Sequence, residues 1–163
     1  MSSLSAIGSV LDVGGGTGLL RPLLPSSWNY TCLDCDTQKL KGFQRKFPKD
    51  KTIKASAIDI PAAEETYDLC ILSAVSHHLE TSELECVLNE ISRVLRNGGQ
   101  LLFYDAIWNP RNIEGRLLWF LDRGSFPRTE NALEGLLKKK YFVRRKRSFK
   151  VLHEYIISWC VKQ

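Results

Sequence analysis

The chain has 163 residues, of which 44% are hydrophobic and 25% are charged. These proportions are ordinary for one globular domain, so we expect residues 1–163 to form a single domain. No apolar run approaches the roughly 20 residues that span a bilayer. The first nine residues also lack the basic start and long apolar stretch of a signal peptide. We therefore expect a cytoplasmic protein.

Cysteines and charge narrow the range of functions. An odd set of five cysteines favours a reducing compartment over a disulfide framework. Cys32 and Cys35 form a C-x-x-C pair, but residues three apart on a strand face opposite sides, so we expect no metal site. The net charge is +5, and the segment Lys138–Lys150 holds eight basic residues and no acid. Two interpretations stay open: this segment binds nucleic acid or an anionic surface, or it protects an edge strand from aggregation.

The chain alternates between apolar runs and segments with a helical period. In the first half of the chain we expect strands at 9–13 and 29–34, a helix at 37–47 that Pro48 closes, and strands at 52–57 and 67–74. A helix then runs from Thr81 to a glycine stop at Asn97–Gly99 and is followed by a strand at 100–106. In the last part we expect helices at 113–121 and 130–139 and an antiparallel pair of strands at 142–149 and 154–161.

This order predicts the fold class. Strands that alternate with helices form a parallel sheet with helices on both faces, and right-handed crossovers make that sheet doubly wound. We therefore expect an α/β protein with a mostly parallel, seven-stranded sheet and an antiparallel final strand. Ligands of such sheets bind at the carboxyl ends of the strands, so the end of the first strand, at Gly14, is the expected site.

A glycine-rich loop, Asp12-Val13-Gly14-Gly15-Gly16-Thr17-Gly18, follows the first strand. Glycines allow backbone to approach a ligand closely, and the helix expected after the loop would present free N–H groups. The dinucleotide fingerprint needs a third glycine or alanine where Leu19 stands, and the P-loop needs a lysine after Gly18. Both patterns fail, and the missing third glycine disfavours a nicotinamide-dependent oxidoreductase. The pattern that fits is D-x-G-x-G-x-G, at Asp12, Gly14, Gly16 and Gly18.

This loop resembles the first motif of class I S-adenosylmethionine-dependent methyltransferases. The resemblance, to small type 11-like domains, runs from about Val10 to the C-terminus, and Glu90–Gly99 is similar to the family's E-x-x-R-V-L-x-x-G-G segment. It implies a Rossmann-like methyltransferase fold, S-adenosyl-L-methionine as cofactor and S-adenosyl-L-homocysteine as product.

The resemblance also assigns the cofactor contacts. Asp34 would bind the ribose hydroxyls, with Asp36 as a nearby alternative, although an acid at a strand end can equally cap a helix. Ser56 stands where the family usually has an aspartate at the adenine, and a hydroxyl can accept the same bond. The implied cofactor-binding residues are Asp12, Gly14, Gly15, Gly16, Gly18, Asp34, Cys35, Ser56, Ala57, Ser73 and Ala74.

Methyl transfer from an activated donor needs alignment and exclusion of water, and it needs a base only where the acceptor carries a proton. His77 and His78 follow the fourth strand and are the candidate catalytic bases. The resemblance implies an alternative for His78, because a histidine at this place in the family often has no catalytic role and only holds the loop. Tyr104, Arg123 and Arg128 are candidate substrate-binding residues, and solvated turn charges are the alternative for the arginines.

The first strand begins within ten residues of Met1, so the N-terminal helical cap that many family members carry is expected to be missing or very short. Either the cleft is open, which suits a bulky acceptor, or it is closed by a missing segment or by a partner chain such as the second copy in a homodimer. The acceptor atom, O, N or C, stays open. The alternative function is a non-catalytic domain of the same fold that binds nucleotide or a protein partner.

Overall fold

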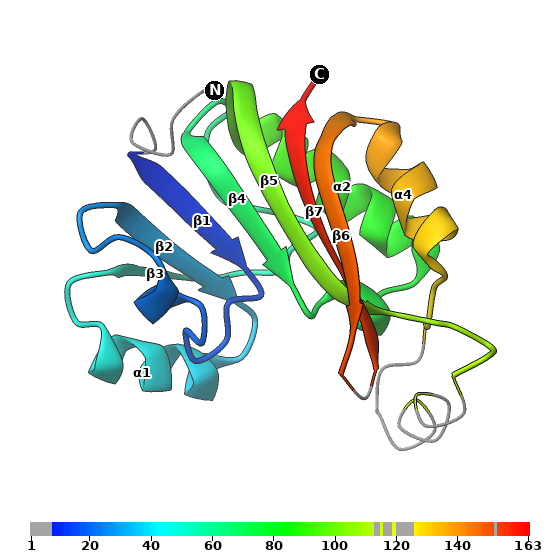
Figure 1. Cartoon of the computed structure of the whole chain (residues 1–163). Helices are drawn as coiled ribbons and strands as arrows, with labels where there is room; N and C mark the ends of the chain where they lie inside the picture. Colours follow the sequence, from blue (N-terminus) through cyan, green and yellow to red (C-terminus); the bar gives the residue numbers. More distant parts are fainter. Residues whose placement is uncertain (1–7, 113–114, 116–118, 120–125, 152) are drawn as a thin grey trace.

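A seven-stranded sheet with strand order β3-β2-β1-β4-β5-β7-β6 forms the centre of the computed structural model (Figure 1). The structure describes residues 8–112, 115, 119, 126–151 and 153–163. All neighbours from β3 to β5 pair in parallel, whereas β7 runs antiparallel to both β5 and β6. The predicted fold class is confirmed. The strands are β1 (Ser9–Val13), β2 (Asn29–Asp34), β3 (Lys51–Lys54), β4 (Tyr67–Ser73), β5 (Leu95–Ile107), β6 (Tyr141–Lys150) and β7 (Glu154–Lys162).

The helices begin where side chains satisfy free backbone N–H groups. Asp36 caps α1 (Thr37–Lys46), and Thr129 caps α4 (Glu130–Lys138). A capping box of Glu80 and Glu83 starts α2 (Thr81–Val94). Two 3-10 turns, η2 (Arg21–Leu23) and η3 (Ser76–His78), complete the described helical elements. Among the described residues, no helix has the length and apolar character to cross a membrane.

The two faces of the sheet are covered unequally. On one face, α2 and α4 contribute to a large core that includes Leu11, Phe103 and Tyr141. On the other face, α1 packs on the β1–β2 end, where Phe43 meets Tyr30. Figure 1 shows α2 and α4 behind the sheet and no helix of the described residues in front of β5, β7 and β6. The expectation of helices on both faces therefore holds for only part of the sheet.

Several elements differ from the predictions. The helix expected after the glycine loop is wrong, because the described segment between β1 and β2 contains only the 3-10 turn η2. The third strand ends at Lys54 rather than at Ala57. Helix α2 ends at Val94 rather than at the glycines, because Leu95 already pairs with Tyr67 in the sheet. Gly98, at φ +71°, lies where the β4–β5 register shifts.

Some predictions fall on residues that the structure describes only in part. Of the helix expected at 113–121, only Gly115 and Trp119 are described, and both are helical. Trp119 is buried, with its ring edge-on to the rings of His77 and His153. Residues 1–7, where a cap would begin, lie outside the described residues.

Candidate active site

The glycine loop folds over the carboxyl end of β2. The backbone N–H groups of Gly14 and Gly15 both donate to the carbonyl of Leu33, at 2.8 and 3.1 Å, and Gly16 N–H donates to Asp34 Oδ2 at 3.0 Å. These bonds hold the loop beside a cleft of about 290 Å³ at the strand ends. The cleft is lined by Asp12, Gly14, Gly15, Gly16, Thr17, Leu19, Leu20, Lys39, Ser73 and Ala74.

The glycines of the loop have different structural roles. A Cβ on Gly15 would lie 2.6 Å from Asp12 Oδ2, and a Cβ on Gly18 would lie 2.5 Å from the Phe43 ring, so packing requires both glycines. Gly16 has φ +56°, but the nearest atoms to a Cβ there would be Lys39 Cδ at 3.8 Å and Asp34 Oδ2 at 3.9 Å. A Cβ at Gly16 would therefore make only ordinary van der Waals contacts, and Gly16 lines the cleft beside Asp34.

This difference predicts unequal effects of alanine on stability. We expect Gly16→Ala to lower the free energy of unfolding by about 1–2 kcal/mol, the cost of a left-handed L-residue. Gly18→Ala adds a clash with Phe43 and should lose roughly 1–3 kcal/mol more. Urea unfolding of both variants measures the difference, and equal losses would contradict this division of roles.

Asp12 is a buried carboxylate beneath the cleft. Its side chain accepts a hydrogen bond from the hydroxyl of Tyr30 on β2. Burial raises the pKa of Asp12 to about 6, the Tyr30 hydrogen bond opposes that rise, and the charge of Asp34 adds to it. The fold thus keeps an acid where its ionised form is costly, which is typical of a functional group.

The raised pKa of Asp12 predicts how stability depends on pH. The folded state binds the proton more tightly than the unfolded chain, so the free energy of unfolding falls as pH rises from about 4 to about 6. A shift of about two pKa units corresponds to roughly 3 kcal/mol. Relative to the wild type, Asp12→Asn should therefore gain about that much between pH 4 and 7 in urea unfolding.

Asp36→Asn provides the control of opposite sign. Backbone hydrogen bonds from Lys39 and Gln38 lower the pKa of Asp36, so its contribution to stability is lost as pH falls. Asp36→Asn should therefore lose stability relative to the wild type as pH rises. The same slope in both variants would contradict the burial of charge at Asp12.

The two acids after β2 have separate contacts. Asp34, only 6% exposed, accepts from Gly16 N–H and Asp36 N–H. Asp36 accepts from the N–H groups of Gln38 and Lys39 as the N-cap of α1. The helix-capping interpretation therefore belongs to Asp36 rather than to Asp34. The role of Asp34 toward a ribose stays a prediction.

Other predicted cofactor residues divide between the cleft and its surroundings. Ser73 and Ala74 line the cleft, and Ala74 has the strained φ of 54°, a feature that clusters at functional sites. The other predicted residues, Gly18, Asp34, Cys35, Ser56 and Ala57, are not among the lining residues. Asp34 nevertheless adjoins the cleft, because it accepts from the N–H of the lining residue Gly16. Ser56 is exposed in the turn after β3, where its hydroxyl accepts from Ile58 N–H at 3.4 Å. Cys32 is buried and Cys35 is exposed.

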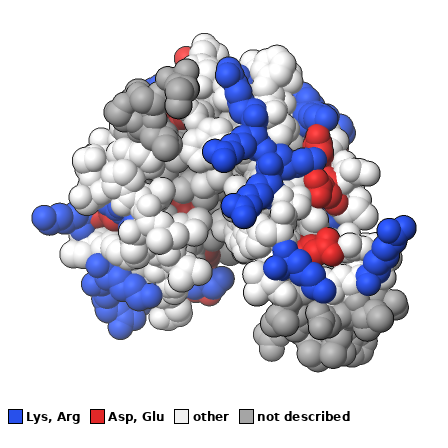
Figure 2. Space-filling model, in the orientation of Figure 1, with Lys and Arg blue, Asp and Glu red and all other residues white. Residues whose placement is uncertain are grey.

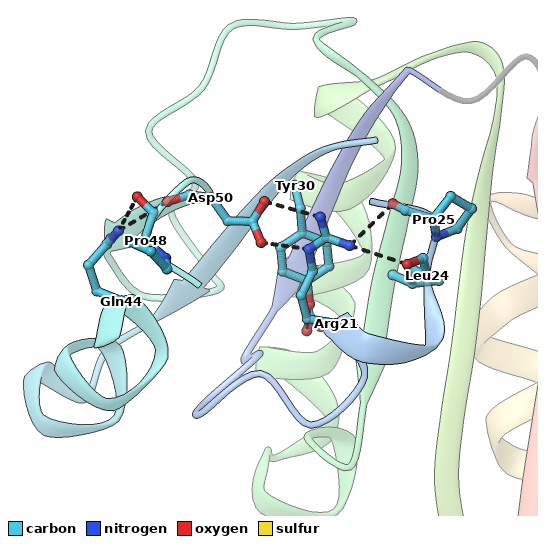
Figure 3. Close-up of polar contacts among 8 residues, drawn as sticks. Arg21, Leu24, Pro25, Tyr30, Gln44, Pro48 and Asp50 are labelled. Carbon is cyan, nitrogen blue, oxygen red and sulfur yellow. Dashed lines mark hydrogen bonds and ion pairs between the residues drawn. The ribbon is translucent and has the colours of Figure 1, made fainter. Parts of the chain in front are cut away.

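The segment between the glycine loop and β2 is held by Arg21 (Figure 3). The guanidinium forms two bonds with the carboxylate of Asp50, at 2.6 and 3.3 Å, and donates to the carbonyls of Leu24 and Pro25. It also lies over the Tyr30 ring, 5.2 Å from the ring centroid. Arg21 thus connects the loop to the strand whose tyrosine contacts Asp12.

A second polar cluster lies at the carboxyl ends of β4 and β5. Asp105, 1% exposed, accepts hydrogen bonds from the backbone N–H of Ser76 at 2.7 Å and its hydroxyl at 2.5 Å. Its other oxygen is 2.5 Å from Nδ1 of His77. In the tautomer with the proton on Nδ1, His77 donates to this oxygen, and the contact fixes the orientation of the ring. The exposed His78 lies beside it, with ring centroids 4.1 Å apart.

The candidate substrate-binding residues lie apart from one another. Arg128 donates to the carbonyls of Ser76 and Leu79 at 2.8 and 2.6 Å, so its contacts hold the η3 loop rather than reach into the cleft. Tyr104 lies on the sheet face beside Tyr155. Arg123 lies outside the described residues. Substrate binding by these residues stays a prediction, and the contacts of Arg128 do not support it.

Comparison with known proteins identifies the family. A family model described as a methyltransferase domain matches residues 11–103, more than half of the chain. The chain belongs to this methyltransferase family. An uncharacterized methyltransferase of Schizosaccharomyces pombe is 31% identical over 112 residues, which are 68% of this chain and 42% of that protein. The predicted membership among S-adenosylmethionine-dependent methyltransferases is confirmed.

One further relative in sequence and one solved structure are similar to this chain. A Mus musculus tRNA (carboxymethyluridine(34)-5-O)-methyltransferase is 33% identical over 103 residues, covering 61% of this chain and 14% of that protein. The chain thus spans less than half the length of these relatives. The crystal structure of the N-methyltransferase NodS from Bradyrhizobium japonicum with S-adenosyl-L-homocysteine has a TM-score of 0.78 at 13% identity, over 96% of this chain and 79% of that one.

The residues of this methyltransferase domain fit the family's cofactor. S-adenosylmethionine carries a sulfonium, and the cleft has the buried carboxylate of Asp12 beneath it. The space beside Gly16 adjoins the carboxylate of Asp34, which can accept from hydroxyl groups. Glycine backbone and the short side chains of Ser73 and Ala74 leave the cleft open.

Several residues of the site were missed by sequence reasoning. Thr17, Leu19, Leu20 and Lys39 line the cleft, and Asp105 orients His77. Asp105 gave one usable signal, an acid at the buried end of an apolar strand. Arg21 gave none, since its partner Asp50 is 29 residues away.

Proposed function

We propose that this protein transfers a methyl group from S-adenosylmethionine to an acceptor at the carboxyl ends of β4 and β5. The observation that carries the proposal is the glycine loop, whose open position at Gly16 adjoins Asp34 while Asp12 lies buried beneath the cleft. Bound there, the cofactor supplies an electrophilic methyl group on a sulfonium. The protein's part is to hold donor and acceptor in line and to exclude water.

Each acid has a distinct role in this proposal. Asp12 presents a negative charge that favours a cationic ligand, which offsets the cost of its burial. Asp34 holds the loop through Gly16 N–H and accepts from the sugar hydroxyls with its remaining lone pairs. Ser73 and Ala74 form the wall next to the acceptor side of the cleft.

For an acceptor that carries a proton, His77 is the base in this proposal. Asp105 holds the Nδ1–H of His77, so Nε2 is the nitrogen that takes the proton. With the cofactor held by the glycine loop and supplying the methyl group, Nε2 of His77 would receive the proton that the acceptor gives up. Asp105 acts as a positioning residue, which stabilises the imidazolium without touching the acceptor.

Calorimetric titration with S-adenosylmethionine tests the proposal, with NAD as the competing ligand. We expect binding of S-adenosylmethionine alone, with affinity lowered at least tenfold in Gly16→Ala and in Asp34→Ala. The exposed Gly135→Ala, whose Cβ meets no atom within 4 Å, is the matched control and should bind as the wild type does. Unchanged affinity in both site variants would sink the assignment.

The alternative is a non-catalytic domain that binds nucleotide or a protein partner. Methyl transfer from labelled S-adenosylmethionine into a cell extract separates the two. A labelled product that depends on Gly16 supports the enzyme, whereas tight cofactor binding without any labelled product supports the alternative. The Mus musculus relative is named for methylation of a tRNA, which makes nucleic acid one candidate class of acceptor for this chain.

A further inference from the structure

The sheet face opposite α2 and α4 carries a group of aromatic and basic side chains. We call it the open face: Leu102 and Tyr104 of β5, Tyr155, Ile157 and Trp159 of β7, and Arg145, Arg147 and Phe149 of β6. Strand pairing places these residues on one face, because residues opposite one another in neighbouring strands point to the same side. The sequence analysis singled out the basic segment and Tyr104, but not the other aromatic residues beside them.

The basic residues of β6 divide by face. Lys146 points toward α4, where it is 2.7 Å from Glu130 and 2.6 Å from Glu134. Arg145 and Arg147 point to the open face, are exposed, and pair with no acid in the described part of the chain. Figure 2 shows basic side chains gathered in front of the sheet on this side of the molecule. The open face therefore has uncompensated positive charge.

Aromatic rings surround these arginines. The rings of Tyr104, Tyr155 and Phe149 are half-buried and nearly parallel. The centroid of the Tyr155 ring is 5.5 Å from that of Tyr104 and 5.6 Å from that of Phe149. Trp159 lies opposite Arg145 on the neighbouring strand. Charge alone would protect an edge strand from aggregation, but that purpose does not account for the half-buried aromatic rings beside the arginines. The combination calls for a ligand that offers both negative charge and flat apolar rings.

We propose that the open face binds single-stranded nucleic acid. Arginines contact the phosphates while aromatic rings stack on unpaired bases, the arrangement that sequence-tolerant single-strand binders use. A duplex hides its bases, and a lipid surface offers no planar rings, so neither matches the whole face. This binding does not depend on the cofactor and so stands apart from the proposed methyl transfer.

The open face also leads to the cleft. Ser73, which lines the cleft, is in register with Tyr104, which faces Ile157, which faces Arg147. Three steps of about 4.8 Å between strands put Arg147 about 14 Å from Ser73 across the sheet. A single-stranded nucleic acid bound to the arginines would thus reach the cleft and present one of its nucleotides there as the methyl acceptor. This delivery step, unlike the binding, rests on the proposed function.

Fluorescence anisotropy with labelled 15-mers of oligo-U and oligo-dT, without cofactor, tests the binding. We expect Arg145→Gln/Arg147→Gln to weaken it at least tenfold and to reduce the salt slope by about 1.4, or roughly 0.7 per phosphate contact. Phe149→Leu keeps an apolar side chain but removes the ring, and should weaken binding about fivefold or more. The RNA and DNA arms show which sugar the face accepts.

The matched control is Lys138→Gln/Lys139→Gln, the same change of charge at residues that pair with Glu134 and Glu85. It should bind within about twofold of the wild type. The proposal is overturned if the arginine variant binds no worse than this control. It is also overturned if a duplex of equal length, or phosphatidylserine vesicles, bind as tightly as the single strands.

Labelled S-adenosylmethionine then tests the delivery. Methylation of the bound oligonucleotide that falls with Arg145→Gln/Arg147→Gln supports it. Binding of both oligonucleotide and cofactor without methyl transfer would overturn delivery while the binding surface stands. Failure to bind the cofactor would instead count against the proposed function.

Discussion

Arg21→Ala should lower the free energy of unfolding by about 3–5 kcal/mol, a large part of the roughly 5–15 kcal/mol that stabilises a domain. The side chains of Arg21 and Asp50 are only 9% and 11% exposed, so removing one partner leaves the other charge poorly solvated. The carbonyls of Leu24 and Pro25 lose their donor as well. Urea unfolding measures the loss.

Two variants establish that the cause is the ion pair. Arg45→Ala removes an arginine of α1 that donates to the carbonyl of Lys41 on an exposed surface, and should change stability by no more than about 0.5 kcal/mol. Arg21→Ala/Asp50→Ala should lose less than the sum of the single losses, since no charge is left unpaired. A loss for Arg21→Ala as small as that of Arg45→Ala would contradict the anchoring role.

The strands were predictable because their signals are local. β1 and β2 match the predicted ranges, since each is a short, mainly apolar run that ends at residues suited to turns. The end of α2 was not predictable in the same way. The helical period runs through Val94 and Leu95, and only the distant Tyr67, by pairing with Leu95, decides that the sheet begins there.

The missing helix after the glycine loop illustrates the same limit. The segment from Leu19 to Trp28 has apolar residues that would suit a helix, yet it forms one 3-10 turn. Its conformation is fixed by Arg21 reaching Asp50 beyond α1, a contact between residues 29 apart in sequence. Sequence reasoning found the site from its glycines, but the side chains that hold the loop come from elsewhere in the fold.

The two histidines show what geometry adds within a site. Adjacent in sequence, His77 and His78 were both candidates for a base. The η3 turn directs His77 to the buried carboxylate of Asp105 and leaves His78 exposed. An orienting carboxylate is the arrangement that general-base histidines require, so the structure favours His77.

His77→Gln should therefore reduce the rate of methyl transfer by about 10²–10⁴-fold for an acceptor that carries a proton, the usual contribution of a positioned base. The affinity for S-adenosylmethionine should not change, because His77 is not among the residues that line the cofactor cleft. Transfer from labelled cofactor under saturating conditions measures the rate, and calorimetry measures the affinity.

Asp105→Asn and His78→Gln complete this test. Asp105→Asn should lower the rate at least tenfold and change the pH–rate profile, because an amide does not stabilise the imidazolium that forms at His77. The neighbouring His78→Gln is the matched control and should stay within a few-fold of the wild type. If His77→Gln retained both the wild-type rate and its pH profile, His77 would be a residue that only holds the η3 loop, and the acceptor would lose no proton to it.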